Sequence, residues 1–193
     1  MLIVGVGCGP GLLTQQAMKA ISSAELIYGS QRAIGLAREF IASTAVVKTI
    51  DNYSRLDELP ENATVLSTGD PMLAGLGRPG HEVIPGISSM QVAFSHLGLQ
   101  LARAAAISAH GTGHRAAMED AIQELKCGKL VFLLAEPSFP FGELMAGLVR
   151  EKMDCRVAVC EELGYPEERI AIGTPESPPE IRSKLYSVVV GKW

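Results

Sequence analysis

The stretch Leu2-Ile3-Val4-Gly5-Val6-Gly7-Cys8-Gly9-Pro10-Gly11 decides how the chain begins to fold. Residues 2–6 form an apolar run of the length expected for a buried strand, and residues 14–21 carry the apolar spacing of a helix. A strand, a glycine-rich turn and a helix in this order are typical of the first unit of an α/β sheet. Because a glycine has no side chain, a ligand can approach the backbone of this turn closely.

The glycine turn differs from both common nucleotide-binding motifs. Counted from Gly5, the third glycine of GxGxxG falls on Pro10, and counted from Gly7 it falls on Leu12. The chain has no GK[ST] sequence, which excludes the phosphate-binding loop of that type. A candidate ligand loop remains, with a purely structural strand-to-helix turn as the alternative.

Short apolar runs alternate with helix-like patterns along the first half of the chain, which predicts a mostly parallel sheet covered by helices. The pattern changes after Leu101, and the last three expected strands, residues 156–160, 169–172 and 185–190, have little helix between them, which indicates an antiparallel component. We therefore expect two α/β domains, residues 1–101 with the glycine-rich loop and residues 102–193 with a mixed sheet. The expected strands are residues 2–6, 25–28, 45–47, 64–67 and 82–84, a strand around 107, and 130–134, 156–160, 169–172 and 185–190; the expected helices are 14–21, 32–40, 88–96, 116–125 and 141–151.

The composition is that of an ordinary globular protein. The 193 residues are 47% hydrophobic and 20% charged, which allows a sizeable core. With 17 basic and 21 acidic residues, the net charge of -4 leaves no basic excess to neutralise a nucleic acid. The first apolar stretch is too short for a signal sequence or a membrane span. We expect a cytoplasmic protein with neither nucleic-acid nor membrane partners.

Three further segments each follow a predicted strand, at the sheet edge where open α/β sheets bind their ligands. Their amides, carbonyls and hydroxyls can bind an adenine edge or ribose hydroxyls. The alternative is that Asp70 and Ser88 only cap helices, a role worth about 1 kcal/mol each, and the two roles are compatible. The segments are Thr68-Gly69-Asp70-Pro71, Pro85-Gly86-Ile87-Ser88-Ser89 and Leu134-Ala135-Glu136-Pro137.

Taken together and in order, these segments resemble the tetrapyrrole methylase family, and the likeness spans essentially the whole chain. Within that family, residues 83–99 and residues 161–170 are similar to the precorrin C5-methyltransferases. One position departs from the family pattern, because Cys8 stands where the usual GxGPG loop has proline. The segments that carry the resemblance are Val4-Gly5-Val6-Gly7-Cys8-Gly9, Ala24-Glu25 to Gly29-Ser30-Gln31-Arg32, Gly69-Asp70-Pro71 and Pro85-Gly86-Ile87-Ser88-Ser89.

The resemblance implies two α/β domains with the cofactor cleft between them, and a homodimer as the usual assembly. It also implies S-adenosylmethionine as the methyl donor, S-adenosylhomocysteine as a product and a tetrapyrrole as the substrate. The cofactor-binding residues implied by the match are Gly7, Cys8, Gly69, Asp70, Leu73, Ser88, Ser89, Leu134 and Leu163.

The implied reaction is methyl transfer to C5 of a corrin precursor in cobalamin biosynthesis. A stand-alone C5 domain resembles the cobalt-first pathway, so we expect cobalt-precorrin-7 as substrate and a separate protein for C15 methylation and decarboxylation. Other enzymes of the class are alternatives, such as a diphthine synthase or a methylase of an earlier tetrapyrrole. A non-catalytic ligand-sensing protein of the same fold is another.

Two polar residues are candidates for the second substrate. His110 follows a predicted strand, where it can bind a substrate carboxylate or help remove a ring proton, although an ordinary exposed loop histidine is the competing interpretation. Arg32 can pair with a substrate carboxylate or can be a solvated helix residue. We expect no metal site, because Gly111 and Gly113 disfavour the helix that would place His110 and His114 on one metal ion.

Overall fold

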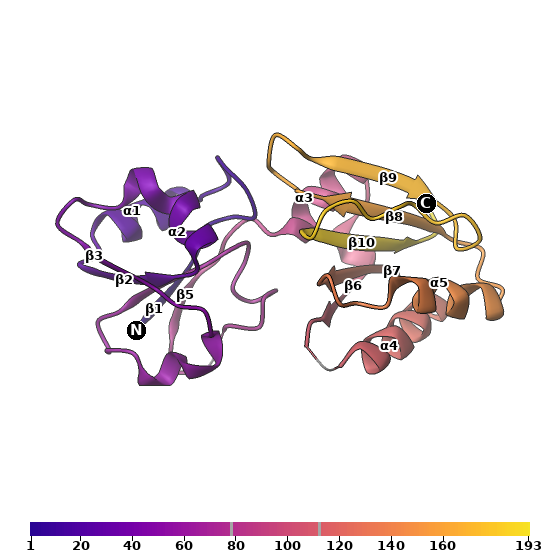
Figure 1. The fold of residues 1–193 in the computed structure, drawn as a ribbon, viewed down its shortest axis with the longest axis horizontal. Helices are drawn as coiled ribbons and strands as arrows, with labels where there is room; N and C mark the ends of the chain where they lie inside the picture. The colour runs from indigo at the N-terminus through magenta and orange to yellow at the C-terminus, as the bar shows by residue number, and fades with distance from the viewer. Residues whose placement is uncertain (78, 112) are drawn as a thin grey trace. The chain divides into compact units, whose positions relative to one another are not determined.

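The structure, a computed structural model, describes residues 1–77, 79–111 and 113–193, without the side chain of Ser54. The chain divides into two compact units, unit 1 (Met1–Ser89) and unit 2 (Met90–Trp193), each with its own five-stranded sheet (Figure 1). The α/β class expected from the sequence is confirmed. The domain boundary expected after Leu101 stays a prediction.

The sheet of unit 1 has the order β3-β2-β4-β1-β5, and every neighbouring pair is parallel. Each strand lies within two residues of its predicted position, because each is a short apolar run bounded by turn residues. The strands are β1 (Leu2–Gly5), β2 (Leu26–Gly29), β3 (Val46–Thr49), β4 (Thr64–Ser67) and β5 (Glu82–Ile84).

Different helices cover the two faces of this sheet. Helices α1 (Gln15–Ser22) and α2 (Gln31–Ala37) pack with Val4 in one apolar cluster, and the 3-10 segment η2 (Tyr53–Glu58) packs with Ile3 in the other. Successive strand residues point to opposite faces, so Ile3 and Val4 belong to different clusters. The helix expected at residues 32–40 ends as α-helix at Ala37 and continues as the 3-10 helix η1 (Arg38–Phe40). The sequence pattern did not predict η2, which is too short for a helical period.

The strand order creates a switch point at the carboxyl ends of β1 and β4. The chain leaves β1 for β2 on one side and leaves β4 for β5 on the other, so the connections diverge from two neighbouring strands. Open α/β sheets bind their ligands outside the carboxyl ends of the strands at such a point.

The sheet of unit 2 has the order β6-β7-β10-β8-β9, in which β6 and β7 are parallel and the other neighbouring pairs are antiparallel. The antiparallel component predicted for the second half is therefore confirmed. The chain directions place the carboxyl ends of β6, β7 and β8 at the same edge. The strands are β6 (Ala104–Ala109), β7 (Leu130–Ala135), β8 (Arg156–Glu161), β9 (Arg169–Gly173) and β10 (Tyr186–Gly191).

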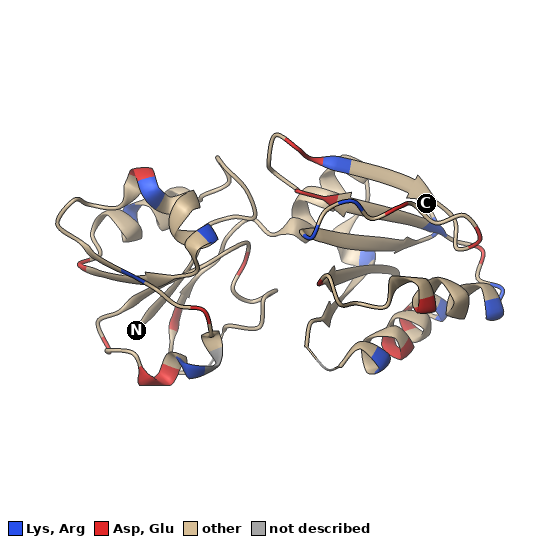
Figure 2. Ribbon diagram, viewed as in Figure 1, with Lys and Arg blue, Asp and Glu red and all other residues tan. Residues whose placement is uncertain are grey.

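Helices α4 (His114–Lys126) and α5 (Phe141–Arg150) share an apolar cluster with Val131 and Leu133 of β7. On the other face of β7, Phe132 contacts Phe94 of α3 (Ser89–Leu97), edge to face with ring centroids 6.5 Å apart. The exposed side of α4 carries charges of both signs (Figure 2). Within the described residues, no helix is long and apolar enough to cross a membrane.

Candidate functional site

Three loops meet at the carboxyl edge of the sheet of unit 1, and their backbones are joined directly. The amide of Gly69, after β4, donates to the carbonyl of Gly7, after β1, at 2.7 Å. The amide of Cys8 donates to the carbonyl of Ile87, after β5, at 3.0 Å. The loops that the sequence singled out separately therefore form one structure.

Glycines are needed here because the loops approach one another backbone to backbone. A Cβ atom on Gly86 would lie 2.2 Å from the carbonyl oxygen of Gly69, and one on Gly5 would lie 2.5 Å from the nitrogen of Gly86. Gly7 has a φ of 78°, and a Cβ there would lie 2.5 Å from the carbonyl oxygen of Leu12. The close packing of the loops therefore accounts for the glycine pattern, which the sequence suggested as a ligand loop.

The carboxylate of Asp70 ties two of the loops together. Its Oδ1 accepts hydrogen bonds from the amides of Met72 at 2.8 Å and Leu73 at 3.2 Å, while its Oδ2 accepts one from the amide of Gly86 at 3.0 Å. The first two bonds form the local turn that the capping interpretation predicts. The third crosses to the loop after β5, a contact that the sequence did not indicate.

Arg32 lies at the start of α2, which follows β2, and its guanidinium donates to the hydroxyl of Thr68 at 3.0 Å. Its side chain is thus held at the carboxyl edge of the sheet and remains exposed. The hydroxyl of Tyr53 supports the same edge, because it accepts from the amide of Ser30 at 2.7 Å and donates to the carbonyl of Leu66 at 2.9 Å. Sequence reasoning missed Tyr53, whose only signal was a lone aromatic residue in a polar stretch.

The remaining candidates of this edge have different exposures. Ser88 is only 5% exposed, and Ser89 is the first residue of α3. Cys8 and Leu73 are half-buried, and Cys8 is not part of a disulfide. These loops, residues 5–11, 68–73 and 85–89, contain Asp70 as their one charged residue and no lysine or arginine.

In unit 2 the candidates also gather at a single sheet edge. His110 directly follows β6, Leu134 lies near the end of β7 and Leu163 follows β8. Leu134 is half-buried and pairs with Ser108 of β6, and Leu163 is buried. The structure thus groups the candidates of unit 1 at one edge and those of unit 2 at another.

The carboxylate of Glu136, directly after β7, is the centre of a polar cluster at the edge of unit 2. Oε1 accepts hydrogen bonds from the hydroxyl of Ser138 at 2.8 Å and the amide of Gly111 at 2.9 Å, and lies 2.9 Å from Nε2 of His114. Oε2 lies 3.5 Å from Nδ1 of His110. Hydrogen bonds from Ser138 and His114, together with smaller contributions from Gly111 and His110, outweigh desolvation and lower the pKa of Glu136 to about 2. The sequence marked the loop after β7 but did not single out Glu136.

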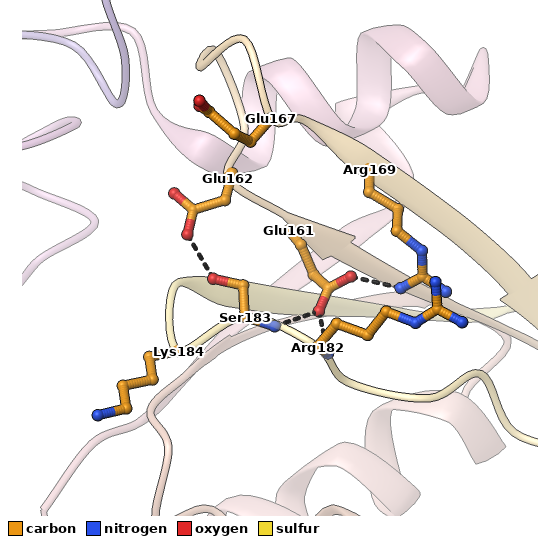
Figure 3. A pocket seen from close by; sticks show the side chains of 7 residues that line it. All are labelled: Glu161, Glu162, Glu167, Arg169, Arg182, Ser183 and Lys184. Atoms are coloured by element: carbon orange, nitrogen blue, oxygen red, sulfur yellow. Dashed lines mark hydrogen bonds and ion pairs between the residues drawn. The ribbon is translucent and has the colours of Figure 1, made fainter.

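A second carboxylate, that of Glu161, ends β8 and is buried, with 2% of the residue exposed. It accepts hydrogen bonds from the amides of Arg182 and Ser183 and from the guanidinium of Arg169, and it lines a hollow of about 530 Å³ (Figure 3). Burial raises the pKa of Glu161, but these donors outweigh burial and leave that pKa below its ordinary value. Because its oxygens are held by the protein, we assign Glu161 a structural role.

Among residues 1–77, 79–111 and 113–193, no group of three or more His, Cys, Asp or Glu side chains is placed to hold a metal ion. The candidate polar groups are the backbone groups of the loops in unit 1 and the histidine–carboxylate cluster in unit 2.

Comparison with known proteins gives one family match. The model of the tetrapyrrole (corrin/porphyrin) methylases matches residues 1–178. A probable cobalt-precorrin-7 C(5)-methyltransferase from Methanocaldococcus jannaschii is 29% identical over 191 residues, which cover 89% of this chain and 88% of the relative.

Two solved structures show the same architecture. The precorrin-6Y methylase of cobalamin biosynthesis from Archaeoglobus fulgidus is 29% identical, with a TM-score of 0.75 over 100% of this chain and 98% of its own. A diphthine synthase is 18% identical, with a TM-score of 0.67 over 100% of this chain and 90% of its own, which shows a shared fold alone.

Proposed function

Because this chain belongs to the tetrapyrrole methylase family, we propose that it is an S-adenosylmethionine-dependent methyltransferase acting on C5 of a corrin precursor, cobalt-precorrin-7, in cobalamin biosynthesis. The main support for the proposal is the sequence similarity to a probable cobalt-precorrin-7 C(5)-methyltransferase, which is 29% identical over most of both chains. The joined loops at the switch point of unit 1 support it, because they lie where open α/β sheets bind their ligands.

We propose that the loops of unit 1 bind the adenosine part of the cofactor, chiefly through backbone amides and carbonyls. Leu134 and Leu163 of unit 2 are further proposed contacts that rest on the family resemblance. When bound, S-adenosylmethionine supplies a methyl group already activated on a sulfonium. The proposed contacts are Gly7, Cys8, Gly69, Asp70, Leu73, Ser88, Ser89, Leu134 and Leu163.

The protein's task in this reaction is alignment, exclusion of water and removal of a proton. A carbon–carbon bond forms to the substrate, the sulfur keeps the electron pair of the broken sulfur–methyl bond, and a proton leaves the substrate. We propose that His110 accepts this proton and that Arg32 pairs with a substrate carboxylate. Arg32 suits that role because Thr68 holds its guanidinium while leaving the side chain exposed.

We expect the purified protein to bind S-adenosylhomocysteine at one molecule per subunit, measured by calorimetry. We also expect methyl transfer to cobalt-precorrin-7 from labelled cofactor, with the label found on C5 by NMR. The metal-free substrate serves as the comparison. Binding without turnover on either substrate would favour a ligand sensor, and methyl transfer to the diphthamide precursor would favour a diphthine synthase.

Asp70→Asn separates the two functions of the Asp70 carboxylate. The asparagine oxygen can still accept from Met72 and Leu73, but the amide group then faces the amide of Gly86, donor against donor. We expect the affinity for S-adenosylhomocysteine to fall about tenfold. The free energy of unfolding should fall by about 1 to 3 kcal/mol, because the buried amide of Gly86 loses its acceptor, while the turn through Met72 and Leu73 is preserved. Asp70→Ala should lose both the turn and the hydrogen bond from Gly86. Wild-type affinity in Asp70→Asn would show that the tie to Gly86 is irrelevant to binding.

Three proposals concern the protein's setting. We propose a homodimer, to be measured by light scattering, and a cytoplasmic location. We also propose that C15 methylation and decarboxylation are carried out by a separate protein of the pathway.

A further inference from the structure

The topology of unit 2 brings His110 and Glu136 together. Strands β6 and β7 are parallel, and their last residues, Ala109 and Ala135, are paired in register. The next residue on each strand is therefore His110 on one and Glu136 on the other, side by side at the carboxyl edge. This placement depends on the strand register and not on a flexible loop.

Glu136 is held firmly in this place. The hydroxyl of Tyr186, at the start of β10, donates to the backbone carbonyl of Glu136 at 3.0 Å. His114 contacts Oε1, as Ser138 and Gly111 do. Its ring also packs edge to face on the ring of Phe139, with the two ring centroids 5.7 Å apart. Glu136 is thus held at two places, at its backbone carbonyl by Tyr186 and at Oε1 by the groups that surround this oxygen.

The two histidines differ in exposure and in the nitrogen that they present to the carboxylate. The side chain of His114 is 18% exposed and presents Nε2, whereas that of His110 is 47% exposed and presents Nδ1. The charged groups that face His110 within the described cluster are Glu136 and, when protonated, His114. An imidazole that presents Nδ1 to one group has its Nε2 on the other side of the ring.

The charge of Glu136 decides which nitrogens carry protons. With its pKa lowered to about 2, the carboxylate is ionised wherever histidines titrate, and an ionised carboxylate only accepts hydrogen bonds. Each neutral imidazole must therefore turn a protonated nitrogen toward it. For His114 this nitrogen is Nε2, and for His110 it is Nδ1, which leaves the lone pair of His110 on Nε2.

We propose that Glu136 is a positioning residue that fixes His110 as the Nδ1–H tautomer, so that its exposed Nε2 can accept a proton, while it fixes the neighbouring His114 as the opposite, Nε2–H tautomer. The contribution to proton removal rests on the proposed methyl transfer. The pair of opposite tautomers does not, because it follows from the positions of the atoms around one carboxylate.

The test is a long-range proton–nitrogen NMR spectrum of the uniformly labelled protein at about pH 8.5, roughly two units above the ordinary histidine pKa. The chain has four histidines, and spectra of His110→Asn and His114→Asn assign the two signals. We expect His110 as the Nδ1–H tautomer and His114 as the Nε2–H tautomer. A wild-type His110 with its proton on Nε2 would overturn the proposal without bearing on cofactor binding.

Glu136→Gln should invert one tautomer and keep the other. Oε1 serves the amide of Gly111, the hydroxyl of Ser138 and Nε2 of His114, so the single oxygen of glutamine should remain there. Its NH₂ group then faces His110, whose Nδ1 must accept and whose proton must move to Nε2. Ser138→Ala is the matched control, because it removes one donor to Oε1 and leaves both tautomers unchanged.

Activity completes the test. We expect Glu136→Gln to lower kcat/KM about 100- to 10,000-fold, the range for loss of a general base, because the inverted tautomer has no lone pair on Nε2, while the affinity for S-adenosylhomocysteine is unchanged. Ser138→Ala should stay within about threefold of wild type. Inverted tautomers with wild-type kcat/KM would overturn the positioning role. An inactive wild type with the expected tautomers would instead count against the proposed reaction alone.

Discussion

Gly86→Ala should destabilise the protein by about 3 kcal/mol and abolish measurable binding of S-adenosylhomocysteine. The added Cβ would lie 2.2 Å from the carbonyl oxygen of Gly69 and 2.9 Å from two backbone atoms of Gly5. Overpacking typically costs about 1 to 3 kcal/mol, and the upper end applies because the atoms in the way belong to backbone and cannot rotate aside. Urea unfolding and calorimetry measure the two effects.

The loss of binding follows from the hydrogen bonds that a displaced loop would break. Movement of Gly86 breaks its bond to Asp70 and disturbs the neighbouring bond from Cys8 to Ile87. Gly35→Ala is the matched control, because Gly35 lies within α2 and a Cβ there meets no atom within 4 Å. Alanine at that helix position should stabilise by about 0.5 to 1 kcal/mol and leave binding intact. Equal stability and equal affinity for S-adenosylhomocysteine in the two variants would show that neither property depends on the close approach of the loops.

The fold was largely predictable because its signals are local. The all-parallel half of the chain shows buried apolar runs separated by capped helices, such as α1, where Thr14 accepts from the amide of Ala17 at 3.1 Å. The late strands were recognisable because helix is scarce between them. The 3-10 segment η2 was missed because it carries no helical period, and its role depends on the distant contact from Tyr53 to Leu66.

The site was predictable only as a set of loops. Strand ends are visible in a sequence, so the loops after β1, β4 and β5 were identified, but the bond from Gly86 to Asp70 joins residues from two of them. Likewise, His110 was chosen for its place after a strand. The register that sets Glu136 beside it depends on the pairing of β6 with β7, which no local pattern reports.

Glu161→Ala should destabilise the protein by about 3 kcal/mol, although Glu161 lies outside the proposed contacts. Removing one partner of a buried ion pair costs about 3 to 5 kcal/mol, because the other charge is left without compensation. The lower end applies because the side chain of Arg169 is 31% exposed and also donates to the carbonyl of Glu180 at 3.1 Å. The amides of Arg182 and Ser183 would lose their acceptor as well.

Glu161→Gln removes the charge of the Glu161 side chain while keeping its shape, so it measures what the charge contributes to stability. One glutamine oxygen can still accept from both amides, since Oε1 alone serves them, but the NH₂ group then faces the guanidinium of Arg169. The expected loss is about 1.5 to 3 kcal/mol, the range for a hydrogen bond to a charged group. Glu119→Gln is the control, because its pair with Arg115 is 3.0 Å long with side chains 66% and 89% exposed. Such a surface pair should contribute less than about 0.5 kcal/mol.

The pH dependence of Glu161→Gln gives the sharpest measurement. The pKa of Glu161 is lowered in the folded protein, so its stabilising contribution is complete above the ordinary glutamate pKa of about 4.3. As the pH falls through the lower folded-state pKa, the native carboxylate takes up its proton and that contribution is lost. The gap between the urea midpoints of wild type and Glu161→Gln should therefore be constant from about pH 7 to pH 5 and shrink below about pH 4. A gap that stays constant into acid would mean that the charge of Glu161 contributes nothing, and that the loss in the variant reflects packing alone.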